Sequence, residues 1–313
     1  MKISVKVPAS TSNLGPGFDC IGMALPVYNT ITIEETVLPG TGIEINVINE
    51  SENADDLLTE HMPLDENSII YKAVEILYNS IGQTPSELKI TVQSQIPIAR
   101  GLGSSASVIV GGLLAANELL GHPADEVALL SIAAEVEGHP DNVTASIVGG
   151  LVLTSLEDDG SVVYRKLDWP EEWQITVCIP DYELSTEISR SVLPKEVPIQ
   201  DAVFNAKRLA MFIQAVNTKD ADLMKMALQD RLHQPYRMKL VPGLDKIMEN
   251  LKHEENVLGC VLSGAGPAIV VISYKNNLDK IKSIIKDTWE EMNVKVNIMT
   301  LPVETQGAQI IRE

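Results

Sequence analysis

From residue 96 to residue 107 the chain reads Ile96-Pro97-Ile98-Ala99-Arg100-Gly101-Leu102-Gly103-Ser104-Ser105-Ala106-Ser107. An alternating pattern from 88 to 95 predicts a β-strand before this stretch, and an apolar run from 106 to 120 predicts a helix after it. Two glycines within three residues permit backbone conformations that a Cβ would forbid, and the two serines that follow are favoured helix N-cap residues. A helix start with free N–H groups binds anions, phosphate above all. We therefore predict a phosphate-binding loop.

Neither of the two common glycine-rich nucleotide motifs, G-x-x-x-x-G-K-[ST] and G-x-G-x-x-G, fits this loop. The alternative to a phosphate site is a strand-to-helix turn that uses glycine and serine for geometric reasons alone. With the preceding proline and the long apolar helix, the pattern resembles the ATP loop of the GHMP kinases, which include galactokinase, homoserine kinase, mevalonate kinase and phosphomevalonate kinase. The resemblance implies ATP binding by Pro97, Ile98, Ala99, Arg100, Gly101, Leu102, Gly103, Ser104, Ser105, Ala106 and Ser107.

Length and composition limit the classes of protein that this chain can be. Its 313 residues suit about two domains, and 45% hydrophobic residues with only 4% aromatic ones predict cores built from aliphatic side chains. A formal net charge of -19 argues against nucleic acid and anionic membranes as partners, because both require basic patches. An anionic substrate would have to be bound by locally placed cations or helix N-termini.

Cysteine usage and the terminal sequence predict a cytoplasmic protein. Cys20, Cys178 and Cys260 are widely spaced and form no C-x-x-C pair, which argues against a disulfide framework or a structural zinc site. The first eight residues alternate as a strand does and do not resemble a signal peptide. The apolar runs 108–120 and 143–153 are too short and too rich in glycine to cross a bilayer.

The N-terminal strand, 2–7, is followed by a segment, 8–25, whose serine, threonine, asparagine, glycine and proline residues predict a loop. From the residues alone, Asn13 and Asp19 could face a ligand or cap turns. The run from Pro8 to Asp19, P-A-S-T-S-N-L-G-P-G-F-D, resembles the opening motif of the homoserine kinases within the GHMP family. That resemblance implies that Asn13 and Asp19 line an amino-alcohol pocket, where a carboxylate would suit a substrate ammonium.

Strands are predicted over 28–35 and 42–48, and a helix is predicted from Asn67 or Ser68 to about Ser80. The segment 49–67 between them is strongly acidic, and we interpret it as a solvated loop, with a metal site as the weaker alternative.

A further helix is predicted over 123–138, with two carboxylates near its C-terminal end. The helix dipole disfavours Glu135 and Glu137 there, so they are either exposed or turned inward to a cation. The GHMP resemblance implies that a glutamate at this place and a loop serine ligate Mg²⁺. Glu135 aligns better than Glu137, and the resemblance does not choose between Ser104 and Ser105.

The residues directly after this helix, Gly138 to Val143, read as turn chemistry or as an acid–base or metal-binding group. They resemble the H-x-D-N of homoserine kinases, which implies that His139 and Asn142 approach the substrate, with Asp141 the weaker match. A glycine turn and a strand are predicted over 145–156, and the polar stretch 157–173 is the expected domain boundary.

The second half carries two arginines that the resemblance places at a substrate carboxylate. After a strand predicted at 174–179, the resemblance implies Thr186 and Arg190, and the later Pro-Tyr-Arg motif implies Arg237. Two converging guanidinium groups would fix the orientation of a carboxylate. Arg231 is expected to be a surface charge.

A glycine loop, 263–267, lies between strands predicted at 257–262 and 268–273, and a helix and a strand follow over 278–292 and 294–301. It could be a tight connection only, but the resemblance implies that Gly264 and Gly266 lie near the nucleotide loop. The resemblance also implies an α+β, two-domain GHMP kinase fold. Residues 1–156 would form the ATP-binding, ribosomal protein S5 domain 2-like domain, and residues 157–313 a ferredoxin-like domain.

The resemblance implies an ATP:L-homoserine O-phosphotransferase that makes the kinase step toward threonine, with ATP and Mg²⁺ as cofactors and L-homoserine as its small-molecule partner. Nucleic acid and membrane partners are not expected, and a homodimer is left open, as is the role of Asp19 as ammonium ligand or general base. The alternatives are a GHMP kinase for mevalonate or an isoprenoid precursor, a decarboxylase of the same fold, and a binding protein without activity. A catalytically silent protein would be expected to lack the loop glycines or the carboxylates, all of which are present.

Overall fold

The computed structural model of the chain describes residues 1–36, 42–50, 63–85 and 87–312. Its first two strands are much longer than the sequence predicts: β1 covers Lys2–Asn13 and β2 covers Gly17–Glu35. The loop expected over 8–25 is therefore wrong, apart from the short connection between the strands. The two strands pair antiparallel from Lys2 opposite Glu34 to Asn13 opposite Gly17, with register shifts after Pro8 and after Ser12. Because pairing satisfies the backbone, the polar side chains of this segment can be buried against partners from elsewhere.

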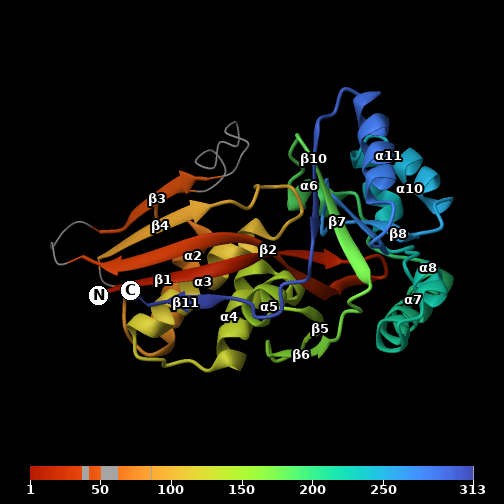
Figure 1. Cartoon of the computed structure of the whole chain (residues 1–313). Coiled ribbons are helices and arrows are strands. Elements are labelled where there is room, and N and C mark those ends of the chain that lie inside the picture. The colour runs from red at the N-terminus through yellow and green to blue at the C-terminus, as the bar shows by residue number, and fades with distance from the viewer. Residues whose placement is uncertain (37–41, 51–62, 86, 313) are drawn as a thin grey trace.

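The N-terminal sheet has the strand order β11-β1-β2-β4-β3, and β5 joins it by pairing with both β2 and β6 (Figure 1). The remaining strands are β3, Glu44–Asn49; β4, Leu88–Ser94; β5, Leu151–Leu156; β6, Val162–Leu167; and β11, Gln309–Ile311. All of these pairs are antiparallel except β3 with β4. The sheet thus takes β6 and β11 from the part of the chain that follows residue 156, where the domain boundary is expected.

Among the described residues, four helices pack against this sheet: α2, Ile69–Ser80; α3, Ser104–Leu119; α4, Glu126–Glu137; and α5, Pro140–Val148. Strand residues such as Val5, Ile31 and Ile90 share one buried core with Val74 and Ile109 of the helices. Leucine, isoleucine, valine and alanine supply most of that core, as the scarcity of aromatic residues predicts.

Helix starts differ from the expected ones in three places. Gly103, and not a serine, is the N-cap of α3. Helix α4 begins at Glu126, because Asp125 caps it by accepting a hydrogen bond from the Ala128 amide. The expected turn at 138–143 is the start of α5, where Pro140 occupies the first turn and needs no N–H partner.

The C-terminal half contains a four-stranded antiparallel sheet with the order β10-β7-β9-β8. Its strands are β7, Trp173–Pro180; β8, Val257–Leu262; β9, Ile269–Tyr274; and β10, Val296–Leu301. The chain follows the strand–helix–strand–strand–helix–strand order of ferredoxin-like units. The helices are α6, Thr186–Ser191; α7, Ile199–Thr218; α8, Ala221–Ala227; α9, Gln234–Arg237; the 3-10 helix η1, Met238–Leu240; α10, Leu244–Lys252; and α11, Leu278–Glu290.

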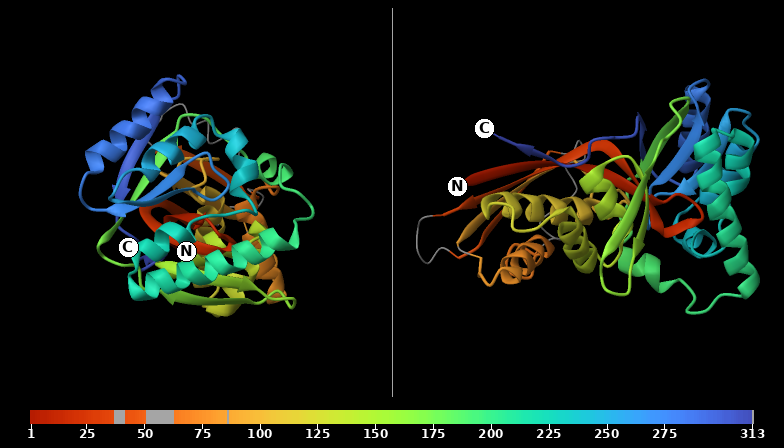
Figure 2. Two further views of the ribbon diagram at one scale, coloured as in Figure 1. Left: turned by 90° about the vertical axis from the view of Figure 1, so that its right-hand side faces the viewer. Right: turned by 90° about the horizontal axis from the view of Figure 1, so that it is seen from below.

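The two halves share a hydrophobic core, and Figure 2 shows them side by side along the long axis of the molecule. Leu14, Ile21 and Met23 from the hairpin of β1 and β2 pack with Val177 of β7 and Val270 of β9. A separate core lies among β7, β8, β9, α10 and α11. The tips of the longest strands therefore reach into the C-terminal half. Within the described residues, no helix is both long and apolar enough to span a bilayer.

Candidate active site

A cavity of about 430 Å³ lies where the two halves meet. Its size is in the range of small-molecule sites. Residues from both halves line it: the loop residues 97–105, Ser12, Asn13, Asp19, Val47, Pro63, Asn67, Ile69, Val92, Ser94, Val108, Glu137, His139, Asp141, Asn142, Ser185, Thr186, Arg190, Arg237, Gly264 and Ala265. The structure therefore brings together, in one place, nearly all of the residues that the sequence singled out. Of the loop residues that were predicted to belong to the site, Ala106, Ser107 and Gly266 do not line this cavity; Ala106 and Ser107 are buried in α3.

The predicted phosphate loop has its glycines where no other residue would fit. Gly101 has φ +77° and a Cβ there would lie 2.2 Å from the Ser263 carbonyl oxygen; Gly103 has φ +66° and a Cβ there would lie 2.2 Å from Ser10 Oγ. These close approaches let the loop turn directly into α3, whose first residues, Ser104 and Ser105, line the cavity. The amides and the positive dipole end of a 16-residue helix thus face the cavity.

Arg100 is only 6% exposed, and it is held by protein groups. Its Nη1 lies 3.5 Å from Glu183 Oε1 and donates to the Ile98 carbonyl at 3.4 Å. The loop therefore offers its backbone amides to an anion, and not the guanidinium of Arg100, which protein groups already hold.

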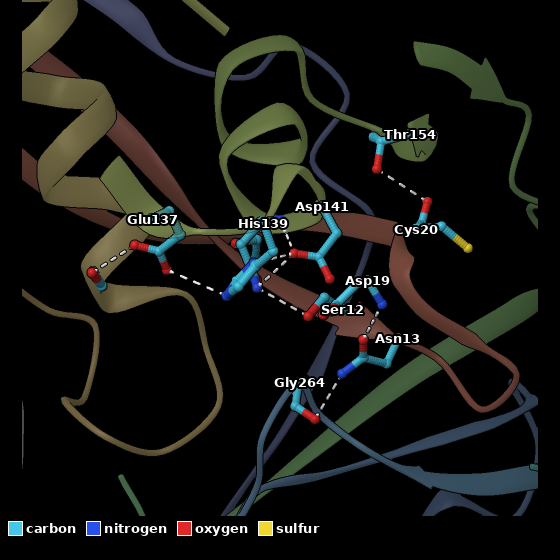
Figure 3. A network of polar contacts seen from close by, with 12 residues as sticks. Ser12, Asn13, Asp19, Cys20, Glu137, His139, Asp141, Thr154 and Gly264 are labelled. Atoms are coloured by element: carbon cyan, nitrogen blue, oxygen red, sulfur yellow. Dashed lines mark hydrogen bonds and ion pairs between the residues drawn. The ribbon is translucent and has the colours of Figure 1, made fainter. Parts of the chain in front are cut away.

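Glu137, and not Glu135, is the carboxylate at the loop. Ser105 Oγ donates to Glu137 Oε2 at 2.7 Å, and the side chain of Glu137 is 10% exposed (Figure 3). Burial raises the pKa of Glu137, against the opposing effects of His139 and of the Ser105 hydrogen bond. Glu135 is exposed on α4 and does not line the cavity. The structure thus places Glu137, and not the expected Glu135, beside the loop, because two residues further along the helix rotate the side chain by about 200° to the inner face.

His139 and Asp141 form a buried pair beside Glu137. His139 Nδ1 lies 2.7 Å from Asp141 Oδ1, and His139 Nε2 lies 3.9 Å from Glu137 Oε1. Burial lowers the pKa of His139, but the Asp141 hydrogen bond and the charges of Asp141, Glu137 and Asp19 outweigh it and raise that pKa to about 9. His139 is therefore an imidazolium at neutral pH, held between two carboxylates.

Both ends of the Asn142 side-chain amide are hydrogen-bonded to protein groups. Its Oδ1 accepts from Ser10 Oγ at 2.9 Å, and its Nδ2 donates to Ser12 Oγ at 2.9 Å. Its backbone amide donates to Asp141 Oδ1 at 2.6 Å. These contacts hold the start of α5 against β1, under the phosphate loop.

Asn13 and Asp19 lie at the turn between β1 and β2, both with positive φ. Asn13 Nδ2 donates to the Gly264 carbonyl at 2.9 Å, and Asn13 Oδ1 accepts from the Asp19 amide at 3.0 Å (Figure 3). The Asp19 carboxylate makes a two-point ion pair with Arg190, with Nη2 to Oδ1 at 2.7 Å and Nη1 to Oδ2 at 3.1 Å. The Asp19 carboxylate, expected to bind a substrate ammonium, and the Arg190 guanidinium, expected to bind a substrate carboxylate, therefore bind one another.

Arg237 is 1% exposed and reaches the cavity from α9. Its Nε donates to the Ser189 carbonyl at 3.1 Å, and its Nη1 donates to the Gly264 carbonyl at 3.2 Å. Burial and the neighbouring Arg190 lower its pKa to about 10, so it keeps its charge at neutral pH. Its Nη2 makes no hydrogen bond with any residue in the described part of the chain, which leaves one edge of the guanidinium for a ligand.

The glycine loop 263–267 joins the two halves at the cavity. The Gly264 amide donates to the Ser12 carbonyl at 3.1 Å, and the Ala268 amide donates to the Arg100 carbonyl at 3.2 Å. Gly264 and Ala265 line the cavity. Thr186, also at the cavity, begins α6 directly after its N-cap Ser185, which accepts from the Ile188 amide.

Sequence reasoning missed the apolar wall of the cavity. Val47, Ile69, Val92 and Val108 line this cavity and come from β3, α2, β4 and α3. Asn67 and Ser94 add polar groups to the lining. An alternating strand pattern marks Val47 and Val92 as buried, but only the packing of four elements shows that they face a cavity.

The donors around Ser105 fit a magnesium ion that also holds phosphate oxygens. Mg²⁺ prefers oxygen ligands and needs only one or two carboxylates when phosphates and water complete its shell. The carboxylate of Glu137, whose side chain is 10% exposed, and the hydroxyl of Ser105 are such donors. No cluster of three histidine, cysteine, aspartate or glutamate side chains that could hold an ion without a phosphate occurs among the described residues.

Comparison with known proteins identifies relatives along the whole chain. Residues 68–150 match the family model described as GHMP kinases N terminal domain, and residues 212–291 match GHMP kinases C terminal. The homoserine kinase of Caldicellulosiruptor saccharolyticus is 43% identical over 98% of this chain and 96% of its own length. That of Synechocystis sp. is 38% identical over 100% of this chain and 99% of its own length.

Solved structures give the same result. A crystal structure of homoserine kinase from Cytophaga hutchinsonii superposes with a TM-score of 0.86 at 27% identity, covering 99% of this chain and 97% of the other. A mevalonate kinase superposes with a TM-score of 0.67 at 18% identity, covering 97% of this chain and 99% of the other. The second likeness concerns the fold alone.

Proposed function

The chain belongs to the homoserine kinases of the GHMP kinase family, and from this premise we propose that it transfers the γ-phosphoryl group of ATP to the δ-hydroxyl of L-homoserine, the kinase step toward threonine. The observation that carries the proposal is identity of 43% over 98% of the chain to a homoserine kinase. The cavity supports it, because the predicted phosphate loop and the charged side chains of Asp19, Arg190 and Arg237 line one space.

The phosphates of ATP would lie against the loop 97–105 and the N-terminus of α3. Backbone amides and the helix dipole are suited to the negative charge of phosphate, and they need no lysine. The wall of Val47, Ile69, Val92 and Val108 offers an apolar surface for the nucleobase.

Glu137 and Ser105 would hold Mg²⁺. When bound, the ion supplies positive charge that neutralises the phosphate oxygens during transfer. The hydrogen bond from Ser105 occupies Oε2 of Glu137, so Oε1 is still available as a ligand, and the Ser105 hydroxyl can offer its oxygen to the ion while it donates its proton to Glu137. Between the two loop serines that the sequence left open, this contact favours Ser105.

L-homoserine would replace the internal ion pair of Asp19 and Arg190 with contacts of its own. Its ammonium would bind Asp19, and its carboxylate would bind Arg190 and the open Nη2 edge of Arg237. Thr186 lines the same end of the cavity. Asn13, His139 and Asn142 would shape the pocket mainly by holding Gly264, Asp19 and Asp141 in place.

In the transfer step the substrate hydroxyl oxygen forms a bond to the γ-phosphorus while the bond from that phosphorus to the β–γ bridging oxygen breaks. ADP leaves, and the hydroxyl proton passes to solvent or to a phosphate oxygen. If Asp19 binds the ammonium, no general base remains for the substrate hydroxyl. A loose transition state does not need one. Its contribution is positioning and charge stabilisation.

A coupled assay of ADP release tests the function with purified protein, ATP and Mg²⁺, and either L-homoserine or mevalonate as acceptor. Turnover with homoserine, and a phosphomonoester product identified by ³¹P NMR, is the expected result. Turnover with mevalonate alone would contradict the amino-acid pocket and leave the fold assignment intact. Homoserine-dependent release of CO₂ would instead indicate a decarboxylase.

Three further proposals concern the whole chain. Division into an ATP-binding part, 1–156, and a C-terminal part, 157–313, is supported by the matches at 68–150 and 212–291 as far as the existence of two parts is concerned. The position of the boundary is not supported in the same way, because β6 and β11 follow residue 156 and pair in the N-terminal sheet. A cytoplasmic location is supported by three free cysteines, of which Cys178 and Cys260 are buried. A homodimer remains a proposal that light scattering on the purified protein would test.

A further inference from the structure

Asn29 is a buried polar residue beside the phosphate loop that the mechanism above does not use. It lies in β2, opposite Val7 of β1 and Ser94 of β4, and it is 0% exposed. It is not one of the described residues that line the cavity. A fully buried asparagine is costly unless its amide is hydrogen-bonded, so its partners indicate what it does.

The oxygen of Asn29 binds the start of the phosphate loop. Asn29 Oδ1 accepts from the Gln95 amide at 3.0 Å, from the Ile96 amide at 3.1 Å and from Ser94 Oγ at 2.9 Å. Two of these donors are the backbone amides at which β4 ends and the loop begins. Because the backbone donors can meet only the oxygen, the orientation of the amide is fixed.

The nitrogen of Asn29 binds the element on the other side of the loop. Asn29 Nδ2 donates to Ser107 Oγ at 2.8 Å, and Ser107 Oγ donates in turn to the Ser104 carbonyl at 2.7 Å. Ser107 lies in the first turn of α3 and is 0% exposed. One side chain therefore connects both ends of the loop that runs from Ile96 to Gly103.

We propose that Asn29 is a positioning residue that holds the two ends of the phosphate loop at a fixed separation, and so sets the affinity for the nucleotide. This inference rests on the proposed function only in naming the ligand. A loop with two glycines at positive φ has many conformations in the absence of restraint, and its amides bind phosphate well only when they already point at it. Fixing the ends from a rigid central strand provides that restraint.

Asn117 offers a matched control, because it lies in α3, the helix that contains the Asn29 partner Ser107. It is 5% exposed, its Oδ1 accepts from the Ala124 amide at 3.0 Å, and its Nδ2 donates to the Ala124 carbonyl at 3.1 Å. It therefore holds a loop end with the same chemistry, but ten residues beyond Ser107, about 15 Å along α3. Loss of either asparagine removes a buried amide clamp, and only the loss of Asn29 should affect the phosphate loop.

The experiment measures the dissociation constant for ADP by calorimetry in the full-length protein and in the variants Asn29→Ala, Asn29→Asp and Asn117→Ala. We expect Asn29→Ala to weaken ADP binding about tenfold or more, as for the loss of a buried hydrogen-bonding group. Asn29→Asp keeps an acceptor for Gln95 and Ile96 and should recover part of the affinity. Asn117→Ala should lower the melting temperature by a similar amount while ADP binding changes less than about twofold. Equal weakening by Asn29→Ala and Asn117→Ala would overturn the proposal.

Hydrogen exchange of peptides covering residues 95–103, in protein without nucleotide, separates this inference from the proposed function. Asn29→Ala should accelerate exchange there relative to both wild type and Asn117→Ala. If wild type bound no ADP, the kinase proposal would fail, and the exchange result would still decide whether Asn29 anchors the loop. Unchanged exchange in Asn29→Ala would contradict the anchoring role, whatever the nucleotide affinity.

Discussion

Charged side chains that line the cavity, where we propose that homoserine binds, are paired with one another in the structure. Asp19 and Arg190 form a two-point ion pair, and Arg190 lies 5.6 Å from the ring of Phe18, which Arg237 also approaches at 5.2 Å. An amino acid carries both a carboxylate and an ammonium, so it can replace both partners of such a pair at once. A ligand with only one of these charges would leave Asp19 or Arg190 unpaired, which disfavours its binding.

Removal of the Arg190 side chain should therefore raise KM for homoserine more than KM for ATP. We expect Arg190→Ala to raise KM for homoserine about 10- to 100-fold, since a hydrogen bond to a charged group contributes about 1.5–3 kcal/mol. KM for ATP should change less than about threefold. Steady-state kinetics with each substrate varied makes the test, with Arg231→Ala as the control, because Arg231 pairs with Asp201 outside the cavity. Equal losses for both substrates would indicate a folding role for Arg190.

The two glutamates at the end of α4 give a second residue-scale prediction. Glu137→Gln should raise the Mg²⁺ concentration for half-maximal activity about 10- to 100-fold, because the variant loses a carboxylate that would ligate the ion. Glu135→Gln, at an exposed position of the same helix turn, should leave the Mg²⁺ titration unchanged. A Mg²⁺ requirement that shifts in Glu135→Gln and not in Glu137→Gln would reverse the assignment.

His233 makes stability depend on pH. Its Nε2 donates to the Gly15 carbonyl at 2.8 Å and its Nδ1 faces Arg237 Nη1 at 3.4 Å, an arrangement that requires the neutral ring. Burial lowers the pKa of His233, although Asp230 opposes the shift. Below an unfolded-state pKa of about 6.5, the unfolded chain takes up a proton that the native state does not, so the free energy of unfolding falls as pH falls.

Urea unfolding at pH 7 and pH 5 measures this loss. The contribution of one group is at most about 1.4 kcal/mol per pH unit, and it should disappear in His233→Gln. His253→Gln is the control, because the side chain of His253 is 71% exposed. The same pH dependence in wild type and His233→Gln would show that other groups cause it.

At the scale of elements, α3 packs so closely on β2 that its residue Gly111 has no room for a side chain. A Cβ on Gly111 would lie 2.6 Å from Ile31 Cγ1 and 2.7 Å from Ile31 Cβ, and the second of these atoms cannot rotate away. This close packing brings the start of α3 under the loop that follows β4.

Gly111→Ala tests that packing. Helix propensity alone predicts a gain of about 1 kcal/mol, whereas overpacking a core costs about 1–3 kcal/mol, and we expect net destabilisation. Asn250→Ala on α10, where the side chain is exposed, should instead be neutral or slightly stabilising. Chemical denaturation gives both values, and a more stable Gly111→Ala protein would contradict the close packing of α3 on β2.

At the scale of the whole molecule, the shared core predicts one cooperative unfolding transition. Leu14 and Ile21 at the tip of the β1–β2 hairpin pack with Ile175 and Val270 of the C-terminal sheet, and β11 returns to pair with β1. Neither half keeps its core or its sheet complete without the other.

Tryptophan fluorescence and far-UV circular dichroism follow that transition separately. All three tryptophans lie after residue 156, at 169, 173 and 289, so fluorescence reports the C-terminal half while dichroism reports all helices. We expect coincident midpoints in urea, as for a two-state protein. Two separated transitions would mean that the halves unfold independently, despite the core that they share.

The sequence by itself determined the local structure and the family. Alternation and the glycine–serine stretch predicted β4, the loop and α3, and the motifs around Asp19, His139, Arg190 and Arg237 identified the residues of one cavity. These patterns are readable because periodicity and turn chemistry act over a few neighbouring residues.

Only the tertiary structure decided the rest. It extended β1 through a polar segment that reads as a loop, chose Glu137 over Glu135, paired Asp19 with Arg190, and brought Asn29 to both ends of the phosphate loop. The last three of these outcomes depend on contacts between residues 32 to 171 positions apart along the chain. Burial and partner geometry, which no local pattern encodes, set the energy of a polar group there.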